Sequence, residues 1–116
     1  MPSDKKPDTQ NRKHFRVKYP FTDRPKFECQ GKKYEIIDVS EQGLAFHIDP
    51  KDGITQSKVP LHGRIHFKSG DTATVAGKIL RTNEDSVIIL LHITVPFATI
   101  MKEQRYMLQK YGKLEQ

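Results

Sequence analysis

The chain has 116 residues, a length that suits one domain with a single hydrophobic core. Twenty Lys and Arg against fourteen Asp and Glu give a formal charge of +6, which favours polyanionic partners: nucleic acid, anionic membrane or a small phosphodiester. No apolar run has the length of a membrane span, the N-terminus lacks the apolar stretch of a secretion signal, and the single Cys29 excludes an internal disulfide, so we expect a cytoplasmic protein.

The first residues predict a disordered arm. Residues 1–11 contain no apolar residue after Met1 and carry two prolines, so they have no apolar surface to bury. We expect the folded domain to occupy residues 12–112, with a short tail at 113–116.

Two arginines stand at the junction between this arm and the first strand. Apolar and polar residues alternate from Phe15 to Phe21, which predicts extended structure, so Arg12 and Arg16 project to the same side, roughly 13 Å apart. A guanidinium can bind a phosphate, or the O6/N7 edge of guanine, through two parallel bonds. The alternative is that both are solvated charges in a basic tail.

A second polar group follows two dozen residues later. A predicted strand carries Asp38 and Ser40 on one side and Ile37 and Val39 on the other. A carboxylate can accept bonds from guanine N1–H and N2–H, and a serine hydroxyl can donate and accept beside it. Gly43 would permit a positive φ and a close approach of ligand to backbone. The alternative is a plain turn at a strand end.

The two groups, RxxxR at Arg12 and Arg16 and DxSxxG at Asp38, Ser40 and Gly43, resemble in order and separation the signature of the PilZ family. That family comprises bacterial receptors for the second messenger cyclic di-GMP. The resemblance implies that the dinucleotide binds between the arginine arm and the DxSxxG strand. Binding would order the arm and expose a surface for a downstream protein in motility, exopolysaccharide synthesis or pilus function.

Four further positions belong to this hypothesis. Many relatives carry a basic residue just before RxxxR, whereas this chain has Asn11, which favours one ligand molecule over two. Arg24, Lys78 and Arg81 are candidate extra phosphate contacts, with exposed charge as the alternative.

Short alternating segments separated by turn residues fill the rest of the chain up to residue 93, which predicts a small antiparallel barrel or sandwich. The expected strands cover 26–30, 33–40, 44–48, 61–67, 73–79 and 87–93, with a polar loop at 50–58. Residues 87–93 are apolar on both faces, so we expect them to lie between the barrel interior and a helix.

That helix is predicted from about 96 to 111. Its apolar residues recur at helical spacing and indicate a core-facing stripe rather than a partner surface: Phe97, Ile100, Met101, Met107, Leu108 and Tyr111. The resulting fold class is mainly all-β, a six- or seven-stranded antiparallel barrel with a C-terminal helix, which the resemblance also implies.

No pattern predicts an enzyme. His62 and His66 lie in a strand segment without partner cysteines or a carboxylate cluster, so neither a metal site nor a cofactor is expected. Motifs for phosphate-binding loops and nucleophile elbows are absent from the sequence. Two other functions stay open: a barrel that binds single-stranded nucleic acid through exposed aromatic residues, and a ligand-independent protein interaction module.

Overall fold

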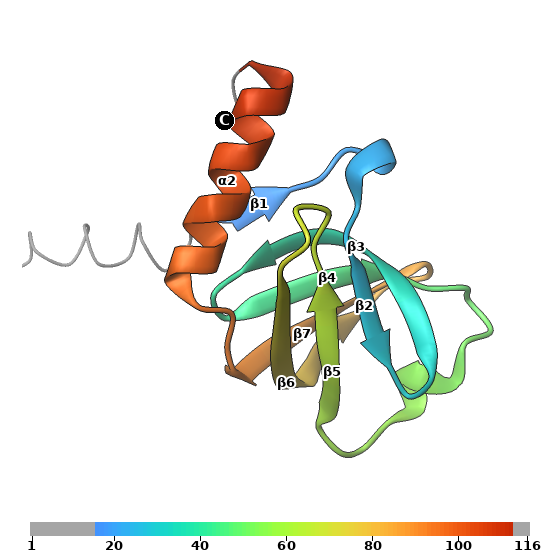
Figure 1. Cartoon of the computed structure of the whole chain (residues 1–116). Helices are drawn as coiled ribbons and strands as arrows, with labels where there is room; N and C mark the ends of the chain where they lie inside the picture. The colour runs from blue at the N-terminus through green and yellow to red at the C-terminus, as the bar shows by residue number, and fades with distance from the viewer. Residues whose placement is uncertain (1–15, 113–116) are drawn as a thin grey trace, which may run out of the picture.

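The computed structural model describes residues 16–112 and contains seven strands and one α-helix (Figure 1). The strands are β1 (Arg16–Lys18), β2 (Lys26–Cys29), β3 (Lys32–Ser40), β4 (Gly43–His47), β5 (Leu61–His66), β6 (Thr72–Thr82) and β7 (Ser86–Ile93), and the helix is α2 (Phe97–Tyr111). Two short 3-10 helices, η2 (Phe21–Asp23) and η3 (Gly53–Gln56), lie in the connections.

The strands form one antiparallel sheet that closes on itself. The order along the sheet is β1-β3-β2-β5-β6-β7-β4, and a further pairing of β3 with β4 completes a six-stranded barrel with β1 as an additional strand. Strand β3 makes this closure possible because its first half pairs with β2 and its second half with both β4 and β1. The predicted fold, an antiparallel barrel with one C-terminal helix, is confirmed.

The barrel interior is filled by one side of each strand. Phe27, Phe46, Ile36, Ile65 and Ile89 are fully buried there. These residues alternate with polar neighbours in the sequence because successive strand residues point to opposite faces of a sheet. Burial of these side chains, each contributing on the order of 2 kcal/mol, makes the interior the main stabilising feature of the fold.

A bulge in β3 determines which face the polar residues of this strand occupy. Ile36 pairs with Phe46 and Asp38 pairs with Ala45, so Ile37 is an extra residue with no partner on β4. A bulge of this kind shifts the alternation of the strand by one residue. The inward positions are therefore Ile36 before the bulge and Val39 after it, and Asp38 faces outward.

The C-terminal helix begins after Pro96 and ends at Gly112, whose φ of 85° closes the last turn through a bond from its N–H to the Leu108 carbonyl. Its buried residues are Ile100, Glu103 and Met107. The predicted core stripe is thus correct at positions 100 and 107 but wrong at Leu108 and Tyr111.

Leu108 and Tyr111 are 43% and 44% exposed, because the helix contacts the barrel through a narrow line of residues. Near the helix end, the Asp23 carboxylate accepts bonds from the Tyr111 hydroxyl and from Lys110 Nζ, the latter at 3.0 Å. This end is therefore held by polar contacts rather than by apolar burial.

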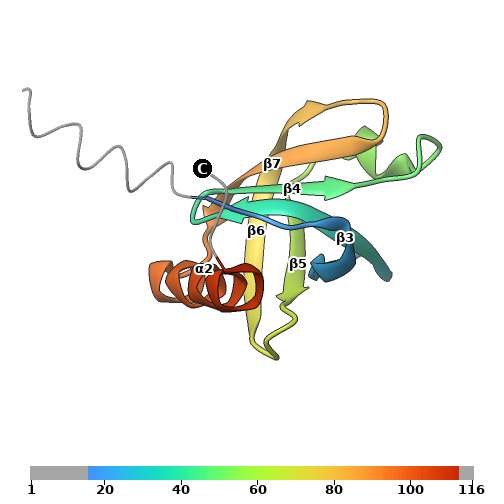
Figure 2. The same ribbon diagram turned by 90° about the horizontal axis from the view of Figure 1, so that it is seen from above.

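The position of the helix also corrects the expectation for β7. Helix α2 lies against β1 (Figures 1 and 2), not over β7. Val87, Ile89 and Leu91 point into the barrel, but the outward Leu90 is 50% exposed and Ile93 is 46% exposed. The run is apolar on both faces, yet only its inward face is fully covered.

Within residues 16–112, no helix has both the length and the apolar character needed to cross a membrane.

Candidate outward-face site

The centre of the candidate site is an ion pair between two of the residues that the sequence singled out. Arg16 on β1 and Asp38 on β3 lie on adjacent antiparallel strands, and Arg16 Nη1 is 3.1 Å from Asp38 Oδ1. Their side chains are 45% and 16% exposed, respectively. Arg12, Asn11 and the predicted arm lie outside the described residues, so the structure places only one of the two arginines.

Strand pairing arranges the outward residues in two rows across β1, β3, β4, β7 and β6, which neighbour one another in this order (Figure 2). One row contains Lys18, Asp38, Ala45, Ile88 and Arg81. Neighbouring strands lie about 4.8 Å apart, so Arg81 is roughly 14 Å from Asp38 along the sheet.

The other row begins with Arg16 opposite Ser40 and continues through Gly43 and Leu90 to Lys78. A Cβ built on Gly43 would lie 3.4 Å from Ser40 Oγ, which shows that these two residues are in contact across the β3–β4 turn. Each row thus has a cation at each end, and between the cations lie a polar residue, Asp38 or Ser40, and small or apolar residues.

Ser40 and Gly43 occupy the turn end of β3 and β4. Ser40 is buried, with 4% of its surface exposed. Gly43 begins β4 in extended conformation, and the positive φ expected there is wrong: in the described part of the chain, the glycines with positive φ are Gly31, Gly70 and Gly112. The absence of a side chain at Gly43 leaves backbone open beside Ser40, and this is the property that a ligand would use.

The pKa of Asp38 reflects its partial burial. Partial burial raises its pKa above the usual value, and the nearby charges of Arg16 and Lys18 offset only part of this effect. A carboxylate in this condition gains more than an exposed one from additional hydrogen-bond donors, because its own solvation is already reduced. Guanine N1–H and N2–H are donors of the right kind.

Lys18 was missed in the sequence. It lies opposite Asp38 in the strand register and is exposed on the same side of β1 as Arg16. The alternation of Arg16 and Lys18 with the buried Val17 contained the signal, since strand residues two apart share a face.

Of the three candidate extra contacts, the structure brings two toward this face and one elsewhere. Lys78 and Arg81 end the two rows, as described above. Arg24 instead pairs with Glu35, with 3.4 Å between Nη1 and Oε1, and its guanidinium lies 5.2 Å from the Phe21 ring centre. Arg24 Nε is buried and has no hydrogen-bond partner among the residues that the structure describes. We therefore leave Arg24 out of the candidate site.

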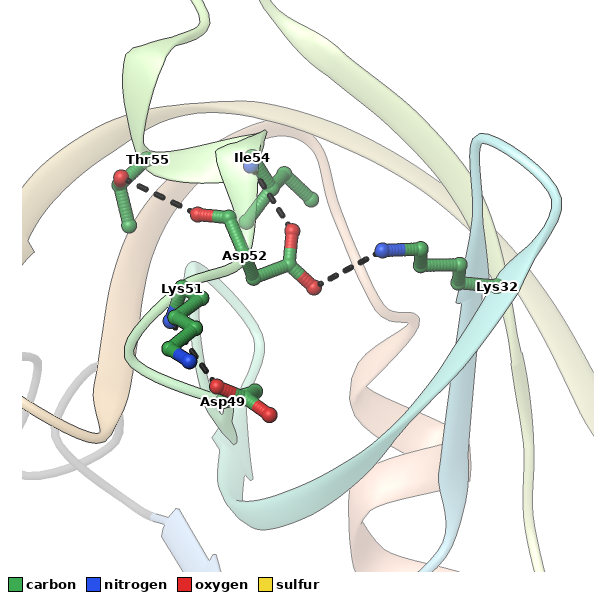
Figure 3. A network of polar contacts seen from close by, with 6 residues as sticks. All are labelled: Lys32, Asp49, Lys51, Asp52, Ile54 and Thr55. Atoms are coloured by element: carbon green, nitrogen blue, oxygen red, sulfur yellow. Dashed lines mark hydrogen bonds and ion pairs between the residues drawn. The ribbon is translucent and has the colours of Figure 1, made fainter.

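The far end of β3 carries a separate polar network (Figure 3). Asp52 accepts bonds from the backbone N–H of Ile54 at 2.9 Å and from Lys32 Nζ at 3.4 Å, and burial and the Asp52 carboxylate both raise the pKa of the nearby Tyr34 hydroxyl. Asp49 caps the same loop by accepting from the Lys51 N–H at 2.9 Å. An open hollow of about 450 Å³ lies beside this loop. The Lys32–Asp52 contact holds the 49–56 loop against the barrel, and the contacts of Asp49 and Asp52 with backbone N–H groups hold the loop in shape.

The structure supplies no metal cluster in the part of the chain it describes, which contains no group of three or more His, Cys, Asp or Glu side chains arranged around a common point. His66 instead pairs with Glu28 on the neighbouring strand at 2.8 Å. Cys29 is buried, and burial raises the pKa of its thiol. This pattern is that of a structural cysteine rather than a nucleophile.

Comparison with known proteins adds family membership to this geometry. The PilZ domain model matches residues 10–111. No curated protein matches the sequence. Among solved structures, the fold is similar to the crystal structure of the Borreliella burgdorferi PlzA protein in complex with c-di-GMP, with a TM-score of 0.52 and 10% sequence identity. The match covers 100% of this chain and 61% of that chain, and at this identity it shows the fold alone. With the family model covering most of its length, the chain belongs to the PilZ domain family.

Proposed function

We propose that this protein is a bacterial receptor for cyclic di-GMP, which binds on the outward face of β1, β3 and β4. The observation that supports this most is the meeting of Arg16 and Asp38 across two strands, with Ser40 and Gly43 beside them, in a chain of the PilZ family. Each group matches a part of a guanine dinucleotide. The solved structure of similar fold is itself a complex with c-di-GMP.

Each residue has a distinct role in this proposal. Asp38 accepts bonds from guanine N1–H and N2–H and becomes better satisfied than in the free protein. Arg16 exchanges part of its bond to Asp38 for a ligand phosphate or the O6/N7 edge of guanine. Ser40 bonds to the ligand at its turn-side edge, and Gly43 leaves room for close approach.

The remaining outward residues fit the rest of the ligand. Ile88 and Leu90 provide apolar surface on which a purine ring can lie, and Leu90 is 50% exposed in the free protein. Lys78 and Arg81 are candidate phosphate contacts at the far side of this surface. In this arrangement, cations flank both edges of the bound dinucleotide.

The segment that carries Arg12 closes over the bound ligand in this proposal, so that both arginines of RxxxR contact it. Fixing about six residues costs on the order of 6–12 kcal/mol, and charge-assisted bonds of about 1.5–3 kcal/mol each must offset that cost. The rearranged segment then presents a new surface to a downstream protein. The family resemblance suggests processes such as motility, exopolysaccharide synthesis or pilus function. The protein would act as a receptor within the cytoplasm rather than as an enzyme.

Titration calorimetry tests the proposal. We expect heat on addition of cyclic di-GMP, and none with GTP or a short single-stranded oligonucleotide. The variants Arg16→Ala and Asp38→Ala should abolish that heat. Arg64→Ala is a matched control, because Arg64 is an exposed arginine on β5, away from the outward-face site.

Binding of the oligonucleotide with steep salt dependence would replace the proposal with nucleic-acid binding. Absence of heat with every probe would favour an interaction module whose motifs serve only the fold.

A further inference from the structure

One charged side chain lies fully buried beneath the helix. Glu103 of α2 is 0% exposed, between Ile100 and Met107 on the face that contacts the barrel. Its Oε1 accepts a bond of 2.6 Å from the Tyr19 hydroxyl, and its Oε2 accepts one of 3.0 Å from Ser69 Oγ. Both carboxylate oxygens therefore have partners from different parts of the barrel.

Burying a carboxylate under a helix costs desolvation free energy. Apolar residues of similar size at such a position often give equal or greater stability, whereas hydrogen-bonded charges fix one specific arrangement. Burial and the neighbouring Glu103 both raise the pKa of the Tyr19 hydroxyl, so the hydroxyl stays protonated and donates its hydrogen bond to Glu103. The contact thus defines where Tyr19 lies relative to the helix.

Tyr19 directly follows β1, the strand that carries Arg16, so the position of Tyr19 affects the position of that strand. Strand β1 has three residues, Arg16–Lys18, and among the strands of residues 16–112 it pairs with β3 alone. The backbone N–H of Tyr19 extends the pairing by one bond, 3.0 Å to the Ile37 carbonyl. So short a strand at a sheet edge has few bonds of its own, and its register depends on what holds its ends.

We propose that Glu103 is a positioning residue for the ligand site: through the Tyr19 hydroxyl it holds β1 in the register that places Arg16 beside Asp38. This inference depends on the proposed cyclic di-GMP function, because its consequence is a change in ligand affinity. In this proposal α2 lies outside the binding face but helps to form it, because Glu103 acts on β1 through Tyr19.

The chain offers a matched pair of variants. Tyr19 and Tyr34 are each 6% exposed, and burial and a nearby carboxylate raise the pKa of each hydroxyl: Glu103, which is hydrogen-bonded to Tyr19, or Asp52, which lies near Tyr34. Tyr34 lies near the opposite end of β3, beside the loop at 49–56, far along the strand from Asp38. Tyr19→Phe and Tyr34→Phe therefore remove the same chemical group from similar surroundings, but only the first touches the strand of Arg16.

Calorimetry with cyclic di-GMP should show about three- to tenfold weaker binding for Tyr19→Phe, because the ligand must then also fix a looser strand. Tyr34→Phe should stay within about twofold of the parent protein. Glu103→Leu fills the buried space without the bond and should weaken binding as Tyr19→Phe does, and the double variant should be no weaker than either single one. Glu103→Gln retains an acceptor for Tyr19 and should restore most of the affinity.

Amide hydrogen exchange on the ligand-free protein separates this claim from the proposed function. Exchange at Val17 and Tyr19 should be faster in Tyr19→Phe than in the parent protein, and unchanged in Tyr34→Phe. If the parent protein binds no cyclic di-GMP, the proposed function fails, and the exchange data still decide whether Glu103 positions β1. Equal affinity and equal β1 exchange in the two tyrosine variants would overturn the inference.

Discussion

Asp38→Asn isolates the charge of the carboxylate with almost no change of shape. Among residues 16–112 this charge has one ion pair in the ligand-free protein, 3.1 Å from an arginine that is 45% exposed, and pairs of that exposure contribute about 0.2–1 kcal/mol. Burial of the carboxylate opposes this gain. We therefore expect the free energy of unfolding to change by less than about 1 kcal/mol.

Ligand binding should respond far more strongly to the same change. An asparagine presents one acceptor oxygen and a donor NH₂ group where guanine also presents donors. Losing charge-assisted bonds of about 1.5–3 kcal/mol corresponds to roughly ten- to hundredfold weaker binding.

Calorimetry would measure the affinity and thermal melts the stability. Glu35→Gln is the control, because Glu35 also lies on β3 and pairs with cations at 3.4 and 3.5 Å, but stands before the bulge. Equal affinity of Asp38→Asn and the parent protein would refute the reasoning, as would a loss of equal size in Glu35→Gln.

Three further outcomes are expected. Gly43→Ala should fold normally, since its Cβ would lie 3.4 Å from Ser40 Oγ. Calorimetry should nevertheless show several-fold weaker binding of cyclic di-GMP, because the methyl group occupies the ligand face. Unchanged affinity would contradict this expectation. Gly77→Ala should lower the free energy of unfolding by about 1–3 kcal/mol or more in denaturant melts, because its Cβ would lie 2.3 Å from the Leu90 carbonyl oxygen. A smaller loss of stability would show that the barrel backbone can shift there. Because the folded-state pKa of Asp38 is raised, its stability contribution is fully present below the usual pKa and is lost as pH rises through the raised value. The parent protein should therefore become more stable relative to Asp38→Asn as the pH falls through that range, while its binding of the ligand weakens. A difference in melting temperature that does not change with pH would contradict a raised pKa for Asp38.

Much of the barrel could be predicted because the interior imposes a period of two on the sequence. What the pattern could not supply is which outward apolar residues are covered. Leu90 and Ile93 continue an apolar run, yet both are about half exposed, and Leu108 and Tyr111 continue an apolar helical stripe with the same outcome. Conversely, Glu103 interrupts that stripe and is fully buried. Coverage depends on where α2 lies, and tertiary contacts with β1 decide that position.

The sequence singled out Arg16 and Asp38 by residue types that suit one ligand, but it did not predict that they form an ion pair with each other. The bulge at Ile37, which keeps Asp38 on the outward face while Ile36 points inward, depends on an extra residue opposite β4 that no local pattern marks. The role of Tyr19 was likewise hidden, because its partner is 84 residues away.

Amide chemical-shift mapping during titration with cyclic di-GMP tests the central claim most directly. The account predicts saturable changes concentrated at Arg16–Lys18, at 38–43 and around Leu90, with none in the Asp52 loop at the far end of β3. Saturable changes confined to that loop, or no change at any ligand concentration, would contradict it.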